Sequence, residues 1–228
     1  NLSAAITYSL EQVDVAEAAL TETADSTDLP DLYNKSQLIV SSSFDNSRPL
    51  FNPRQGFYNV NSVSIGGLGF GNETRFVKVL ADLRRYQPLG SFVLAARIKV
   101  GGIRAIGAES FVPVEELLYS GGSSSVRGWA RYELGPQVDG EPIGGQSLVE
   151  ASAELRYPVY GILSGVVFAD AGNVWTESFF YDLTDIRYCV GTGIRVTTPI
   201  GPIRLDVARP VADEEDEMQF HISIGQAF

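Results

Sequence analysis

The chain has 228 residues, of which 44% are hydrophobic and 20% charged, and its formal net charge is -11. This acidic balance argues against a general nucleic-acid binder, which needs a cationic stripe to displace counterions from phosphates. The single cysteine, Cys189, excludes an internal disulfide framework and a cysteine-based zinc site, so we expect it to pack as a small residue. No window approaches the roughly 18 consecutive apolar residues of a membrane-spanning helix, which leaves soluble all-β proteins and membrane β-barrels.

Alternation of apolar and polar residues along the chain predicts about ten β-strands. The clearest example places Val149, Ala151, Ala153, Leu155 and Tyr157 on one face and Glu150, Ser152, Glu154 and Arg156 on the other. A short helical turn is an option only at 13–20, within an acidic stretch that ends at Pro30. The strands are predicted at about 2–11, 37–44, 57–66, 77–84, 92–100, 149–157, 165–174, 187–196, 203–207 and 219–228.

One connection, at about 101–146, is far longer than a hairpin loop and contains the motif Gly121-Gly122-Ser123-Ser124-Ser125-Val126-Arg127-Gly128-Trp129. Its glycines permit a positive φ and a close approach of the backbone to a neighbouring surface, and Trp129 adds a large ring. On these nine residues alone, a buried loop tip carrying Arg127 and a Gly/Ser-rich turn in solvent are equally good interpretations.

The predicted strands fit either a soluble sandwich or a membrane barrel, because both bury one face of each strand. Three observations favour the barrel. Tight turns containing proline alternate with longer polar loops, as at the two rims of an outer-membrane barrel. Aromatic residues gather at strand ends, and the polar faces mix acidic with basic residues, as a wet lumen would. The fold class that the sequence predicts is therefore all-β, a transmembrane antiparallel β-barrel.

Six segments of the chain carry a resemblance to a known family. They are SRPLFNPRQG (47–56), GGSSSVRGW (121–129), ASAELRYP (151–158), FADAGNVW (168–175), TPIGPIRLDVARPV (198–211) and a last strand ending in Phe228. With these segments in this order, the chain resembles the C-terminal part of the outer-membrane assembly-factor superfamily, whose members include BamA, TamA and the two-partner secretion transporters. Its C-terminal stretch is most similar to TamA. Trp129 departs from the tyrosine or phenylalanine that is usual at this motif position.

The resemblance implies a 16-stranded barrel in the outer membrane of a Gram-negative-type envelope, with POTRA domains upstream. Ten strands cannot close that barrel, and an open sheet edge in lipid leaves unpaired backbone groups. We therefore expect residues 1–228 to be the C-terminal part of a longer barrel, with the loop at about 101–146 folded into the lumen. A short family member that closes as a dimer is the alternative.

The resemblance also implies a function in which outer-membrane proteins are inserted without ATP. The first and last barrel strands would part at a lateral gate and let a client strand add by β-augmentation. We expect Gln219 to Phe228 to be the closing strand, including Phe220, with Gly225 weakening it and Phe228 resembling an assembly signal. Expected partners are nascent barrel or autotransporter clients, outer-membrane lipids and periplasmic or lipoprotein partners. A two-partner secretion pore and a passive channel are the alternative functions.

Arg127, with its motif neighbours Val126, Gly128 and Trp129, is the main candidate functional residue. A guanidinium in a narrow lumen needs carboxylates, and the resemblance implies acidic partners at the positions of Glu154 and Asp170. We expect no enzymatic activity and no cofactor. The only histidine, His221, lacks a triad motif and should be a satisfied lumen residue. The acidic run 213–217 lacks the spacing of a calcium loop, so we expect no metal site.

Overall fold

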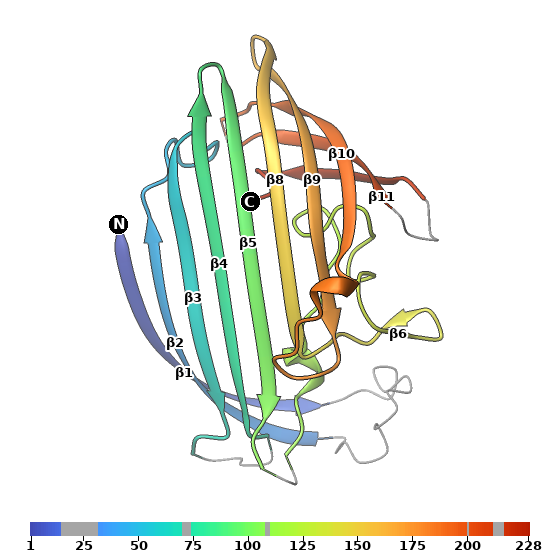
Figure 1. Ribbon diagram of the computed structural model, residues 1–228. Helices are drawn as coiled ribbons and strands as arrows, with labels where there is room; N and C mark the ends of the chain where they lie inside the picture. The colour runs from blue at the N-terminus through green and yellow to red at the C-terminus, as the bar shows by residue number, and fades with distance from the viewer. Residues whose placement is uncertain (15–31, 70–73, 108–109, 200, 212–216) are drawn as a thin grey trace.

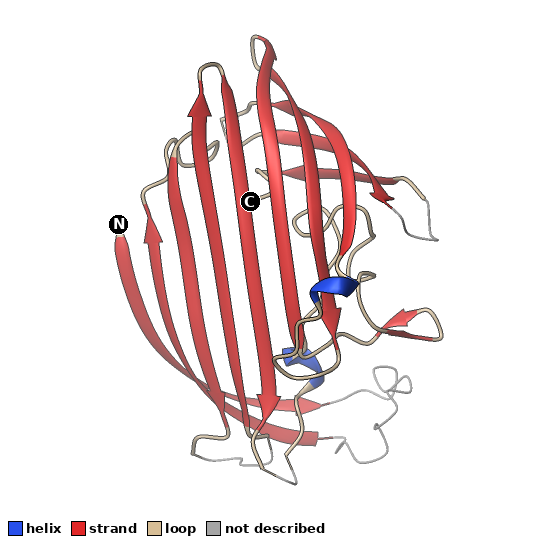
Figure 2. Cartoon of the chain, viewed as in Figure 1, coloured by secondary structure: helices blue, strands red, loops and turns tan. Residues whose placement is uncertain are grey.

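The computed structural model describes residues 1–14, 32–69, 74–107, 110–199, 201–211 and 217–228, which form one curved antiparallel sheet (Figure 1). Within the described residues, ten strands follow one another across this sheet in chain order. Strand is by far the main secondary structure (Figure 2). The strands are β1 (Leu2–Asp14), β2 (Leu32–Asp45), β3 (Gly56–Gly66), β4 (Phe76–Leu89), β5 (Phe92–Ala105), β8 (Ser147–Tyr160), β9 (Leu163–Trp175), β10 (Arg187–Val196), β11 (Ile203–Val211) and β12 (Gln219–Ile224).

The prediction of ten strands is confirmed, although several strands are longer than their alternation indicated. The helical turn considered at 13–20 is not formed at Val13 and Asp14, which belong to β1, and 15–20 lie outside the described residues. No helix among the described residues is long and apolar enough to cross a membrane.

The two faces of the sheet differ in the way that the alternation predicted. On β8, Glu150, Ser152, Glu154 and Arg156 are all buried on the concave side, whereas Ala153 between them is exposed on the convex side. The convex face carries large exposed apolar side chains along the length of the strands. They include Leu94, Ile98, Val190, Ile194, Leu205 and Ile222.

This convex apolar face decides between a barrel wall and a soluble sandwich. A sandwich would cover it with a second sheet, but the other ladder of the described residues is the short pair β6 (Gln137–Val138) and β7 (Glu141–Pro142). An apolar surface of this extent needs another apolar phase around it. The sheet is therefore a transmembrane barrel wall, and it is open, with β1 and β12 at its two edges.

The connections sort by length onto the two ends of the sheet (Figure 1). Short turns join β4 to β5 and β8 to β9 at one end, while the long connection between β5 and β8 starts at the other. That connection, residues 106–146, contains the short 3-10 helix η3 (Val114–Glu116) and packs against the concave face. A second 3-10 helix, η4 (Leu183–Asp185), lies between β9 and β10.

The expectation that the last strand runs from Gln219 to Phe228 is wrong in its bounds. Strand β12 ends at Ile224, and Gly225 adopts a φ of 97° that turns the backbone out of the sheet. Its amide donates to the carbonyl of Pro202 at 2.8 Å. Gly225 therefore ends the strand and does not loosen its interior.

Phe228 also lies in a different place from the one expected of a strand-terminal aromatic residue. Its side chain is 6% exposed and packs with Tyr86, Ala95 and Ala227 on the concave side of the sheet. Apolar burial explains this position, because the tail after Gly225 gains contacts inside the wall that an extended strand would not make. The tail thus lines the lumen.

Candidate functional site

The base of the long loop is fixed to the sheet by a cluster of ion pairs around the buried Lys35. The ammonium of Lys35 lies 3.0 Å from both Glu115 and Glu116, and that of Lys78 lies 3.0 Å from Glu116. Burial raises the pKa of Glu116, but the positive charges of Lys78 and Lys35 outweigh it and hold that pKa below its usual value. The loop is therefore held to β2 and β4 before it reaches its tip.

The tip of the loop turns sharply and is tied to β8. Gly121 and Gly122 have φ values of 101° and 102°, and the amide of Gly122 donates to the carbonyl of Trp129 at 3.0 Å. The hydroxyl of Ser120 donates to Glu150 at 2.9 Å, and that of Ser125 donates to the same carboxylate. These bonds close the turn and aim residues 126–129 at the sheet.

Arg127 is fully buried, and the structure places both expected carboxylates against it. Its Nε and Nη2 each donate to the carboxylate of Asp170 at 2.8 Å, and its backbone amide donates to the same group at 3.1 Å. Its Nη1 donates to Glu154 at 2.5 Å. The guanidinium also lies over the ring of Phe168, 3.4 Å from the centroid. A lysine cannot reproduce this planar set of contacts.

Burial by itself lowers the pKa of the Arg127 guanidinium, because charge is disfavoured away from water. Hydrogen bonds to Asp170 and the negative charges of Glu154, Asp170 and Asp206 outweigh burial and raise that pKa above its usual value. The side chain is therefore a permanent cation held between acidic groups.

The network around Arg127 extends to residues that the sequence analysis did not assign to it. Asp206 on β11 lies 3.7 Å from Arg127 Nη1 and accepts a 2.5 Å hydrogen bond from Arg195 on β10. Arg156 donates from Nε to Glu154 at 2.8 Å, and Arg204 lies 3.4 Å from Asp206. The sequence could have indicated Asp206 as a further partner, because the alternation of β11 places it on the same inward face that Asp170 occupies on β9.

The three other residues of the motif are set by packing. Val126 and Trp129 are 0% and 4% exposed in one apolar cluster with Phe168. A Cβ added to Gly128 would lie 2.5 Å from the Cβ of Cys189, so only glycine fits there without a shift. Cys189 is fully buried under the motif, which agrees with a packing role.

His221 connects the motif to strand β12. Its Nε2 lies 2.9 Å from the backbone carbonyl of Arg127, and since a carbonyl only accepts, Nε2 carries the proton. On the same strand Gln219 pairs with Ala208 of β11, and Phe220 is 68% exposed on the convex face. The loop tip therefore contacts the edge strand as well as the wall.

A model of the Omp85 superfamily domain matches residues 1–228 of the chain. The chain belongs to the Omp85 superfamily. The resemblance based on the six segments is thereby confirmed, and three of them, 151–158, 168–175 and 198–211, include the acidic strand residues that contact Arg127. The matches to its curated relatives span only 15–26% of the length of those proteins, so the chain corresponds to one part of each.

Relatives of this Omp85 chain come from bacteria, plants and animals. It is 28% identical over 195 residues to "Outer membrane protein assembly factor BamA" of Neisseria meningitidis, a match covering 69% of this chain and 24% of that protein. "Outer envelope protein 80, chloroplastic" of Arabidopsis thaliana is 32% identical over 118 residues, which are 48% of this chain and 15% of that protein. "Sorting and assembly machinery component 50 homolog" of Mus musculus is 26% identical over 126 residues, or 55% and 26%.

A solved structure supports the same fold. The crystal structure of BamA from Haemophilus ducreyi lacking POTRA domains 1-3 superposes with a TM-score of 0.76 and 21% identity. The match covers 99% of this chain and 51% of that one. The ten strands therefore share the fold of part of that BamA chain.

The last question about the site is whether its residues are placed to bind a metal ion. Within the part of the chain that the structure describes, no group of three or more His, Cys, Asp or Glu residues is placed to hold a metal ion. Residues 213–216 of the acidic run considered for cations lie outside the described residues. What the arrangement can do is hold a loop rigidly against β8 to β11 while contacting the adjacent edge strand.

Proposed function

We propose that this Omp85 chain is the C-terminal part of an outer-membrane barrel that assembles other outer-membrane proteins. The observation that carries the proposal is the contrast at the Arg127 loop. Asp170 and Glu154 hold the loop to the wall, whereas among the described residues one hydrogen bond, from His221 to the Arg127 carbonyl, joins it to β12. The names of the bacterial and mouse relatives, an assembly factor and a sorting and assembly component, support the same role.

In the proposed mechanism the edge strand opens sideways and pairs with a strand of the client. Strand β12 has only six residues, and Gly225 turns the chain away directly after it. Such an edge offers backbone donors and acceptors to an incoming strand at small cost to the barrel. Each new backbone hydrogen bond of the client replaces one lost at the seam. The process then needs no ATP, no cofactor and no covalent chemistry.

The partners that this mechanism requires are unfolded outer-membrane barrel or autotransporter clients and the surrounding outer-membrane lipids. The apolar convex face, with exposed residues such as Ile194 and Leu205, supplies the lipid contact. Periplasmic or lipoprotein partners would bind through upstream POTRA domains in the full-length protein.

The test is client folding by the full-length protein in liposomes without nucleotide. We expect it to accelerate membrane insertion of a barrel client, followed by the change in gel mobility between heated and unheated samples. A cysteine replacing Ser223 on β12, paired with one on the barrel strand that faces it, should stop this acceleration when oxidised. Reduction should restore it.

The assembly function and the opening of the seam beside β12 can be disproved independently of each other. If the full-length protein does not accelerate insertion at all, the assembly function is wrong. If the oxidised variant is as active as the reduced one, the barrel assembles clients by a route other than the seam beside β12. A cysteine pair joining β9 and β10, such as one at Ala169 and Val190, controls for the effect of a disulfide in the wall.

A further inference from the structure

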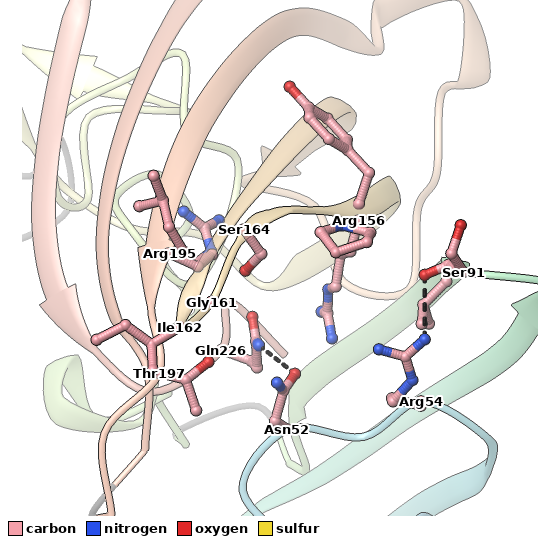
Figure 3. A pocket seen from close by; sticks show the side chains of 14 residues that line it. Asn52, Arg54, Ser91, Arg156, Gly161, Ile162, Ser164, Arg195, Thr197 and Gln226 are labelled. Carbon is pink, nitrogen blue, oxygen red and sulfur yellow. Dashed lines mark hydrogen bonds between the residues drawn. The ribbon is translucent and has the colours of Figure 1, made fainter.

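A polar cavity of about 130 Å³ opens at the end of the sheet that carries the short turns (Figure 3). Its walls come from the turns after β2, β4, β8 and β10, from the adjoining ends of β5, β8, β9 and β10, and from the tail that follows β12. The tail closes one side, where the amide of Gln226 donates to the Asn52 side chain at 2.8 Å. A cavity of this size has room for more than one water molecule or for one small polar ligand.

Positive charge lines this cavity. Arg54, Arg156 and Arg195 all contribute to it, and its lining contains no Asp or Glu. In Figure 3 the guanidinium of Arg156 lies between the Asn52–Gln226 pair and Arg54. Arg54 itself is exposed and donates from Nη2 to the carbonyl of Ser91 at 3.0 Å, which leaves its other N–H groups for a ligand.

Two of these arginines are buried with N–H groups that lack an acceptor. Arg156 and Arg195 are 7% and 2% exposed. Among the described residues, Nη1 of Arg156 and Nε of Arg195 have no hydrogen-bond partner. Nη2 of Arg156 lies 2.7 Å from Glu154, although the hydrogen bond to that carboxylate comes from Nε. Buried charged donors of this kind are costly unless an acceptor satisfies them.

The buried network that contains them is also unbalanced. Among the described residues, the ion pairs around the loop motif join four arginines to three carboxylates, so four positive and three negative charges leave a net charge of +1. Arg54 raises this to +2 at the cavity. The network members are Arg127, Arg156, Arg195, Arg204, Glu154, Asp170 and Asp206.

We propose that this cavity binds one phosphate group. Its oxygens would accept from Arg54, from Nη1 of Arg156 and from Nε of Arg195, with the hydroxyls of Ser164 and Thr197 completing the shell. Guanidinium groups match the spacing of phosphate oxygens, and an oxyanion of charge -1 to -2 offsets the excess of the network. The phosphate is either free in solution or part of a phospholipid headgroup at this rim.

A phosphate bound in this cavity would also affect the tail that follows the edge strand β12. Gln226 forms part of the cavity wall and stands two residues beyond the end of β12. An anion held by the wall arginines would therefore stabilise the inward position of the tail. This site is independent of the proposed function, because its ligand and its test involve no client.

The experiment measures phosphate binding to the full-length protein in detergent by isothermal titration calorimetry, at constant ionic strength set with sodium chloride. Inorganic phosphate is the first probe, and short-chain phosphatidylglycerol is the second, with the matching diacylglycerol as its uncharged counterpart. We expect Arg54→Gln to weaken binding of the phosphate probe roughly tenfold, since one charged donor is lost. Because Arg54 is exposed, this variant should keep its thermal midpoint.

Arg85→Gln is the matched control, since it removes the same charge from an exposed residue on the other face of the same end of the sheet. It should bind like the unmodified protein. Binding of both phosphate probes supports a site for either source, and binding of the phospholipid alone identifies the headgroup as the source. The proposal is overturned if neither probe binds, if the diacylglycerol binds equally well, or if Arg54→Gln and Arg85→Gln have the same affinity.

Discussion

The wall from β8 to β11 and the edge strand β12 hold the same loop by different means. On the wall, Arg127 is fully buried and hydrogen-bonded to Asp170 and Glu154 on strands of 13 and 14 residues. On the edge, a strand of six residues meets the loop through His221 and the carbonyl of Arg127. The loop is therefore fastened firmly to one neighbour and weakly to the other.

This difference matters for a protein whose proposed activity requires one seam to part. Charge-assisted hydrogen bonds in a buried site are strong, and removing one partner is costly because the other charge is left unpaired. A neutral hydrogen bond contributes only about 0.5–1.5 kcal/mol. The edge can then move while the loop keeps its position on the wall, and the variants below test each side in turn.

The largest effect on stability is expected from Arg127→Ala, which removes the contacts between the loop and the wall. It leaves Asp170 and Glu154 buried without their cation, and the free energy of unfolding should fall by about 3–5 kcal/mol. Arg127→Lys should lose roughly half as much, because it keeps the charge but not the planar contacts. Urea unfolding of the full-length barrel measures both.

Assembly by these variants separates a structural role from a functional one. We expect both to lose client insertion per folded molecule, since the loop no longer holds its place on the wall. Normal insertion by the folded fraction would mean that the pair anchors the loop and does nothing more. Arg131→Ala, four residues along the same loop at an exposed position, is the control and should behave like the unmodified protein.

A charge placed on the convex face tests whether that face contacts lipid. Ala153 lies on the convex face at the middle of β8, so Ala153→Arg should lower the free energy of unfolding in a bilayer by about 2–4 kcal/mol. Val159→Arg near the end of the same strand should cost only about 0–1 kcal/mol, because the penalty falls with depth. Equal unfolding free energies for the two variants in liposomes would mean that the convex face of β8 does not cross the hydrocarbon core.

Much of this wall could be predicted from the sequence, and the reason is physical. Because one face of each strand meets lipid and the other a polar lumen, apolar and polar residues alternate strictly, and this alternation marks the ten strands in the sequence. Asp170 stands out because it interrupts an apolar strand, and Arg127 because its glycines allow a buried turn. Their contact across 43 residues follows from the need of each buried charge for a partner.

The edge could not be predicted in the same way. Gly225 could weaken a strand or end it, and only the packing of Phe228 against Tyr86 and Ala95 selects the second. His221 contacts a carbonyl 94 residues away, and a backbone acceptor carries no side-chain signal in a sequence. Alternation reports which face a residue occupies, but it does not report which partner it meets there.

Gly128→Ala changes how closely the loop approaches the wall without altering charge. Its new Cβ would meet the Cβ of Cys189 at 2.5 Å, and such overpacking should cost about 1–3 kcal/mol. The displaced loop should also uncover the Cys189 thiol, which maleimide labelling of the native barrel detects. Ser124→Ala, exposed in the same loop, should leave the thiol protected. Equal labelling of both variants would show that the wall adapts to the added methyl group.

The smallest effect is expected at His221, and it concerns the edge alone. His221→Leu removes the bond to the Arg127 carbonyl, worth about 1 kcal/mol, while leaving Asp170 and Glu154 in contact with the guanidinium. Amide hydrogen exchange should therefore rise about fivefold in β12 and stay unchanged in β9. His221→Gln keeps a donor at this position and should restore most of the protection. If exchange rises equally in both strands, the edge and the wall move as one unit, and the seam cannot open independently of the loop.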